Sequence, residues 1–130
     1  MQKDFIKTGA IAGALAVILG AFAAHGLKNV LLPAHLQIFE TAVKYQFYHV
    51  FALLAVGIIY KDFENKYLLL AGRLFLAGIV LFSGSLYFLT YVKYAELPLN
   101  WLGAVTPFGG AAFVAGWMLL FYGIFKKAKN

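Results

Sequence analysis

The polar side chains that could do chemistry gather in two neighbouring stretches of a very apolar chain. The first stretch ends at His25, directly after a run of alanines and glycines, and the second begins at Glu40. Glu40 and Lys44 lie four residues apart. Tyr45 and His49 repeat that spacing, so each pair would share one side of a helix. These groups suit a network that fixes two helices together, a ligand site, a proton relay or a metal site.

A metal site is the least favoured of these roles. Zinc is bound by imidazole and carboxylate groups. The candidate ligands are His25, His35, His49 and Glu40. Their spacing matches neither the H-x-x-x-H nor the H-E-x-x-H pattern. The chain also has no cysteine, which excludes thiolate ligands and thiol catalysis. We therefore expect no metal ion and no cofactor.

Motifs of known enzyme classes are not found either. Ser83 and Ser85 do not stand between a strand and a helix, as the serine of a nucleophile elbow does. Gly109 and Gly110 lack the lysine and the spacing of a phosphate-binding loop. Acid–base catalysis by paired carboxylates would require a second acid beside Glu40. We therefore expect a protein that is not an enzyme.

The composition of the chain indicates a membrane as its surroundings. Its 130 residues are 63% hydrophobic and 12% charged, with a mean hydropathy of +0.82, whereas soluble domains are roughly half apolar and about a quarter charged. Its long apolar runs suit helices that cross a hydrocarbon core of about 30 Å, and they lack the alternation that barrel strands require. The sequence predicts an all-α integral membrane four-helix bundle, a single domain over 1–130 with spans at about 6–25, 45–60, 67–92 and 101–125.

The first apolar run is interpreted as a membrane helix. A basic start before an apolar centre is also typical of a secretory signal peptide, but we expect no soluble domain after it. Small residues recur at every fourth position of this run, at Ala12, Ala16, Gly20 and Ala24. They predict a smooth face for close contact with another helix.

The second span is predicted to be preceded by an amphipathic helical extension. Pro33 suits the first turn of a helix, where its missing N–H is not needed. An apolar face recurs at intervals of three and four, and it consists of Leu36, Phe39, Val43, Phe47, Val50 and Leu54. The opposite side is expected to be polar, with Glu40 and His49 at its margins. It carries Gln37, Thr41, Lys44, Tyr45, Tyr48 and Ala52.

Glycine and proline predict the shape of the last span. The segment Thr106–Gly110 contains a proline and two glycines and predicts a kink inside this helix. Gly109, Gly116 and Gly123 stand seven residues apart and are expected to mark the face by which the helix packs. In the third span, Ser83–Ser85 falls near the middle, where hydroxyl groups usually bond to a neighbouring helix.

Basic residues predict the orientation in the membrane. The net charge of +6 lies in gaps and tails between apolar runs, so we expect no nucleic-acid partner. One side of the membrane collects Lys3, Lys7, Lys61, Lys66, Arg73, Lys126, Lys127 and Lys129. The other side has Lys28, Lys93 and Lys44. Because basic residues are retained on the cytoplasmic side, both termini are expected to face the cytoplasm.

The polar stretches predict a pocket in the outer leaflet. We hypothesise that it binds a small molecule or a lipid headgroup and is bounded by His25, Glu40, Lys44, Tyr45, His49, Ser83, Ser85 and Thr106. Polar groups within a bilayer are costly, which favours a role for such a cluster. The alternatives are a structural or assembly partner of another membrane protein, and an oligomeric proton or solute transporter. The partners considered are the bilayer, this ligand and further copies of the chain.

Four blocks of the sequence resemble a known family. They are residues 19–27 (LGAFAAHGL), 39–49 (FETAVKYQFYH), 82–87 (FSGSLY) and 106–110 (TPFGG). In this order they are similar to the YgdD/YwdK-like small membrane proteins, domain of unknown function 423. The resemblance implies a four-helix protein of the bacterial cytoplasmic, or inner, membrane with no assigned activity. Position 44, Lys44 in this chain, is often glutamine in that family, so the resemblance argues against a mechanism that requires a lysine charge there.

Overall fold

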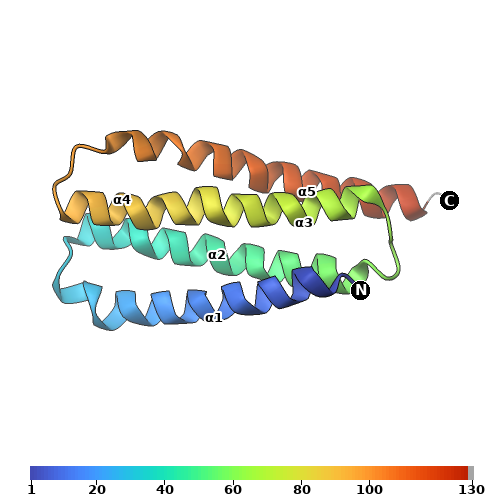
Figure 1. Cartoon of the computed structure of the whole chain (residues 1–130), viewed down its shortest axis with the longest axis horizontal. Helices are drawn as coiled ribbons and strands as arrows, with labels where there is room; N and C mark the ends of the chain where they lie inside the picture. Colours follow the sequence, from blue (N-terminus) through green and yellow to red (C-terminus); the bar gives the residue numbers. More distant parts are fainter. Residues whose placement is uncertain (129–130) are drawn as a thin grey trace.

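Four long helical segments, each antiparallel to the next, run along the length of the molecule (Figure 1). The computed structural model describes residues 1–128. Each segment is long and apolar enough to cross a membrane, which confirms the predicted all-α membrane bundle. The segments are α1 (Lys3–His25), α2 (Pro33–Ile59), a rod composed of α3 (Lys66–Gly78), η2 (Ile79–Gly84) and α4 (Ser85–Tyr94), and α5 (Thr106–Ala128). Two connections contain short 3-10 turns, η1 (Leu27–Asn29) and η3 (Asn100–Ala104).

Asn65 shows how the chain begins one of these rods. Its side-chain Oδ1 accepts hydrogen bonds from the N–H groups of Tyr67 (2.9 Å) and Leu68 (3.1 Å). This caps the first turn of α3, where N–H groups have no partner within the helix. The Asn65 Nδ2 group donates to the carbonyl oxygens of Phe63 (2.7 Å) and Gly123 (3.2 Å). The same side chain therefore attaches α3 to the end of α5.

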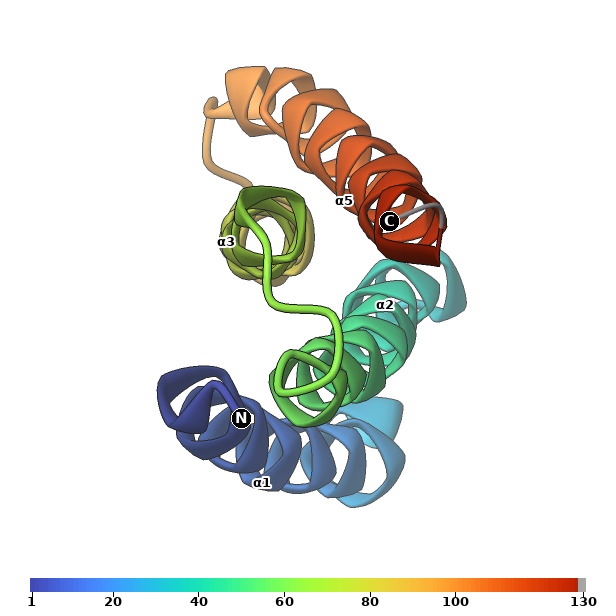
Figure 2. The same cartoon turned by 90° about the vertical axis from the view of Figure 1, so that its right-hand side faces the viewer.

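Helix α2 is the central helix of the bundle (Figure 2). The amphipathic extension and the second span form this one continuous helix, which packs against α1 on one side and against α3, η2 and α4 on another. Phe39, Val43 and Val50 of the predicted apolar face are buried. Ala52 and His49, expected on the polar side and at its margin, are also buried. That expectation was wrong for both residues because α2 has neighbouring helices on more than one side.

Helix α1 packs against α2 through its small residues. A Cβ atom added at Gly9 would lie only 2.8 Å from Leu54 Cδ2 of α2. Ala16 and Ala23 are buried on the same face, whereas Ala24 is exposed. The predicted small-residue contact face is thus confirmed, with Ala23 in the place expected for Ala24.

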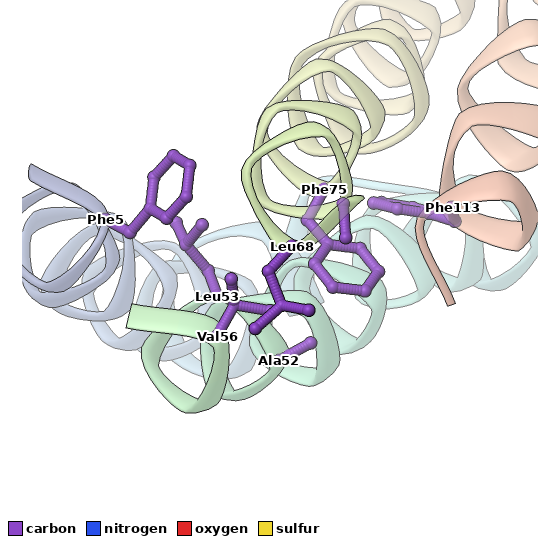
Figure 3. Close-up of a cluster of buried hydrophobic side chains, with 8 residues drawn as sticks. Phe5, Ala52, Leu53, Val56, Leu68, Phe75 and Phe113 are labelled. Carbon is purple, nitrogen blue, oxygen red and sulfur yellow. The ribbon is translucent and has the colours of Figure 1, made fainter. Parts of the chain in front are cut away.

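The main apolar core lies toward the end of the bundle that carries the N-terminus, and Figure 3 shows its side chains. Side chains from α1, α2, α3 and α5 meet there, namely Phe5, Ala52, Leu53, Val56, Leu68, Ala71, Phe75 and Phe113. Lipid tails are as apolar as these side chains, so close packing rather than exclusion from water stabilises this core.

The glycines of α5 form its packing face, as their spacing of seven predicts. Gly109, Gly116 and Gly123 are all buried. A Cβ atom at Gly116 would lie 2.7 Å from Phe75 Cε1, and one at Gly109 would overlap the backbone of Phe82. Only glycine lets α5 approach the α3–η2 rod this closely.

The predicted kink at Thr106–Gly110 was wrong. Helix α5 begins at Thr106, directly after the η3 turn, so Pro107 lies in the first turn of the helix instead of its interior. At that position the missing N–H of proline removes no helical hydrogen bond. The proline and the turn before it therefore start the helix instead of bending it.

Candidate functional site

The residues predicted to bound one pocket line separate grooves. Glu40 and Lys44 border a shallow groove of about 300 Å³ between α1 and α2. Tyr45 and His49 border a second groove, of about 600 Å³, between α2 and α5. Ser85 borders a third groove, between α1 and α4.

The other three predicted residues line none of these grooves. His25 is exposed at the end of α1. The Ser83 side chain is fully buried and donates a hydrogen bond to the carbonyl oxygen of Ala42 in α2 (2.7 Å). Thr106 lies at the start of α5, where its hydroxyl contacts that of Ser85 (2.7 Å). The structure brings only Ser85 and Thr106 of the predicted set into direct side-chain contact across helices.

Gln46 joins three helices near the middle of the bundle. Its Nε2 group donates to the carbonyl oxygen of Ala12 in α1 (2.8 Å), and its Oε1 accepts from the hydroxyl of Tyr87 in α4 (2.7 Å). The amide is 4% exposed. These two bonds assign the orientation of the amide, since the Tyr87 hydroxyl can satisfy the oxygen while the Ala12 carbonyl requires the nitrogen.

The pocket predicted from the sequence does not include Gln46, although this residue lies between Tyr45 and His49 in the second polar stretch. The sequence does contain a pattern that points to Gln46. A second set of α2 residues, spaced three and four apart, is buried in the structure and consists of Ala42, Gln46, His49, Leu53 and Val56. Residues three and four apart share one side of a helix. A glutamine and a histidine on such a stripe predict buried hydrogen bonds, because unpaired polar groups are costly there.

His49 connects α2 to α5. Its Nδ1 lies 2.7 Å from the carbonyl oxygen of Tyr45, and its Nε2 lies 3.1 Å from Nε1 of Trp117. The indole N–H only donates, so Nε2 accepts and the proton of the neutral ring is on Nδ1. The ring stacks on Phe113, with centroids 3.4 Å apart. Neither ring nitrogen is free for a ligand, and no three His, Asp or Glu side chains in the described part of the chain could hold a metal ion.

A hydroxyl chain supports the π turn η2. The Ser85 hydroxyl donates to the carbonyl oxygen of Phe82 (2.9 Å), so it must accept its bond from the Thr106 hydroxyl (2.7 Å). Turns of this type interrupt the regular hydrogen-bond ladder and are frequent at functional sites. Ser83 and Ser85 thus hold the π turn against α2 and against the start of α5.

The π turn forms one wall of the groove between α1 and α4, called here the α1–α4 groove. It has a volume of about 570 Å³. Its lining consists of Ala12, Leu15, Leu19, Gln46, Ile79, Val80, Leu81, Gly84, Ser85, Tyr87, Phe88, Trp101, Leu102 and Val105. A further hollow of about 380 Å³ adjoins it at Tyr87 and continues toward the η1 turn. In Figure 2, α1 runs from beneath α3 to beneath α2, so α1 and the α3–α4 rod diverge along their length.

The chain is similar to known proteins over most of its length. Residues 19–110 match the family described as "Protein of unknown function (DUF423)". The chain belongs to this family. It is 44% identical over 125 residues to a UPF0382 membrane protein of Staphylococcus saprophyticus, covering 96% of this chain and 99% of that protein. No solved structure matches.

Two further relatives come from other bacteria. The UPF0382 membrane protein YwdK of Bacillus subtilis is 42% identical over 120 residues, 92% of this chain and 94% of its own. A UPF0382 membrane protein of Haemophilus influenzae is 40% identical over 127 residues, 98% of each chain. The names of these DUF423 relatives agree with the four apolar helices, and the chain is an integral membrane protein. The match contains the hydrogen-bonded residues Gln46, His49, Ser83, Ser85, Tyr87 and Thr106.

Proposed function

We propose that this protein binds a lipophilic molecule of the bilayer, a membrane lipid, by holding one hydrocarbon chain in the α1–α4 groove, and that it is not an enzyme. The proposal rests mainly on the open space beside Gly84. A Cβ atom added at this position meets no atom within 4 Å. Its backbone angles of φ −59° and ψ −46° are ordinary helical values that any residue adopts. Packing within the chain therefore does not require glycine at position 84, and the absence of a side chain there adds to the open volume of the groove.

The chemistry of the groove suits a hydrocarbon chain. Its walls are formed by leucine, isoleucine, valine and phenylalanine side chains of α1, η2 and α4. Its volume of about 570 Å³ lies in the range of about 300–1,000 Å³ that is usual for small-molecule sites. Three polar side chains of its lining, those of Gln46, Ser85 and Tyr87, already bond to the protein's own helices. The groove therefore favours apolar contact over polar recognition of a ligand.

The same hydrogen bonds support a role without catalysis. Gln46 is bonded at both its nitrogen and its oxygen, and His49 at both ring nitrogens. A general base or nucleophile must have a free atom within reach of the substrate. In this protein the buried polar groups hold helices together.

We also propose the cytoplasmic membrane as the location, with both termini in the cytoplasm. The N-terminus, the α2–α3 connection and the described end of α5 lie at the same end of the bundle (Figure 1). Lys3, Lys7, Lys61, Lys66 and Lys126 belong to this end. Because the opposite end has fewer basic residues, the positive-inside rule supports this orientation. Trp101 and the η3 turn would then mark the outer end of the α1–α4 groove.

A glycine replacement tests the groove. We expect Gly84→Leu to fill the groove and to lose its lipid, seen as a loss of co-purifying lipid in native mass spectrometry. Gly103→Leu is the matched control, because a Cβ atom at Gly103 also meets no atom within 4 Å and Gly103 does not line the groove. Both variants should retain the parent's thermal unfolding in detergent. Equal lipid retention by folded Gly84→Leu and Gly103→Leu would overturn the proposal.

A further inference from the structure

Two opposite charges lie on the exposed surface of α2, within the segment Pro33–Ile59 that is long and apolar enough to cross a membrane. Helix α2 has 27 residues and Gln46 at its midpoint. At a rise of about 1.5 Å per residue, Lys44 lies about 3 Å and Glu40 about 9 Å from that midpoint. Half the thickness of the hydrocarbon core is about 15 Å. Both residues are exposed on the protein surface, so in a bilayer they would face lipid.

Nothing within the described part of the chain balances these charges. The described side chains contain one ion pair, between Lys61 and Asp62, and no hydrogen bond involves the side chain of Glu40 or Lys44. Charged groups within a membrane almost always face the interior of a bundle or pair with each other. An exposed acid and base at this depth therefore indicate a surface that another protein covers.

We propose that this surface binds a second copy of the same chain in a two-fold symmetric dimer, in which Glu40 of each copy pairs with Lys44 of the other. Copies inserted in the same orientation are related by an axis along the membrane normal, so identical residues lie at equal depth. A two-fold interface makes each contact twice. Two Glu40–Lys44 pairs then form, and the four charges sum to zero.

The direction of helical side chains matches this pairing. Side chains on a helix point toward its N-terminus. Glu40 lies one turn N-terminal to Lys44, so the Lys44 ammonium group extends toward the depth of Glu40. In the dimer, that depth is also the depth of the other copy's Glu40. The one-turn offset between acid and base therefore suits a partner of the same sequence.

The groove beside the charges leaves room for a partner helix. Gly20 and Ala23 of α1 line it together with Glu40, Val43 and Lys44. A Cβ atom at Gly20 would lie 3.4 Å from Val43 Cγ1, an ordinary contact, so the packing of α1 on α2 does not require glycine there. Small residues at a membrane-exposed surface permit close approach of a second helix. An acid and a base one turn apart on the same exposed face make this surface complementary to itself, so it suits a second copy of the chain.

Cysteine crosslinking in native membranes provides the test. The chain has no cysteine of its own, so Gln37→Cys introduces one reporter on the exposed side of α2, one turn from Glu40. A short bis-maleimide should join two copies through Cys at this position. Met118→Cys, exposed on α5, is the matched control and should give no dimer.

Charge reversal decides whether the pair holds the dimer. Glu40→Lys and Lys44→Glu, each added to Gln37→Cys, place like charges together and should lower the crosslinked dimer by about tenfold or more. When these two variants are co-expressed with tags of different size, opposite charges again face each other in a mixed dimer. Crosslinking should then give the mixed dimer and neither of the two uniform dimers. Undiminished crosslinking of either single variant, no recovery in the mixture, or crosslinking to a different protein instead of a second copy would overturn the proposal.

Discussion

The α3–α5 interface and the α1–α4 groove use glycine in opposite ways. In the interface, α5 approaches so closely that Gly109, Gly116 and Gly123 have no room for a Cβ atom. In the groove, Gly84 faces open space. Glycine on a membrane helix thus has two meanings, close contact or free volume. The neighbouring segment decides which one applies.

The two regions also differ in how much of each helix is covered. Helix α2 is the most buried of the four spans and α1 is the least. Helix α1 exposes large side chains such as Ile11, Ile18 and Phe22 along most of its length, which suits lipid contact in a membrane. The groove therefore lies beside the helix that the rest of the chain covers least.

The largest effect is expected from Gly109→Ala in the α3–α5 interface. The added methyl group would overlap the backbone of Phe82, and backbone cannot rotate away as a side-chain end can. We expect a loss of about 3 kcal/mol or more in the free energy of unfolding. Unfolding from mixed micelles by a denaturing detergent, followed by circular dichroism, measures it. An unfolding curve equal to that of the parent would contradict the close contact.

An intermediate effect is expected from Gln46→Leu at the boundary between the two regions. This change removes the bonds to Ala12 and Tyr87 and leaves the Tyr87 hydroxyl without its acceptor. We expect a loss of about 1–2 kcal/mol for the two bonds together, since one interhelical hydrogen bond in a membrane contributes about 0.6 kcal/mol on average. Tyr87→Phe should cost less in the Gln46→Leu background than in the parent, because the same bond is already lost. Strict additivity in this double-mutant cycle would contradict the bond.

The smallest effect is expected from Gly84→Ala in the groove. The methyl group meets no atom within 4 Å, and alanine in a helix is favoured over glycine by about 0.5–1 kcal/mol. The free energy of unfolding should stay the same or rise by up to that amount. The same detergent titration compares it directly with Gly109→Ala. A loss as large as that of Gly109→Ala would show that the groove is closed.

Much of the fold follows from patterns along the sequence. Run lengths predicted four membrane helices, and the spacing of seven predicted the glycine face of α5. Both predictions depend only on helical geometry, since residues seven apart lie on nearly the same side of a helix. The predicted kink was wrong because proline occurs both in the first turn of a helix and at a break inside one. Only the position of the η3 turn distinguishes the two.

The candidate site was harder to predict. Successive residues on a helix differ by about 100° in direction, so Glu40 and Lys44 share a face that Gln46 and His49 do not. The polar stretch predicted a single pocket, but the residues of α2 face several neighbouring helices. The partners Tyr87 and Trp117, 41 and 68 residues away from their acceptors, have no local signal in the sequence.

By itself the sequence determined the class of molecule and the segments that cross the membrane, because both depend on the hydropathy and spacing of neighbouring residues. It also determined which helix faces are smooth enough for close contact. Only the tertiary structure decided which polar groups of α2 are buried and bonded, and which glycine leaves a groove open. Those properties depend on the helix that lies opposite each residue, and helix neighbours are set by packing between segments far apart in the chain.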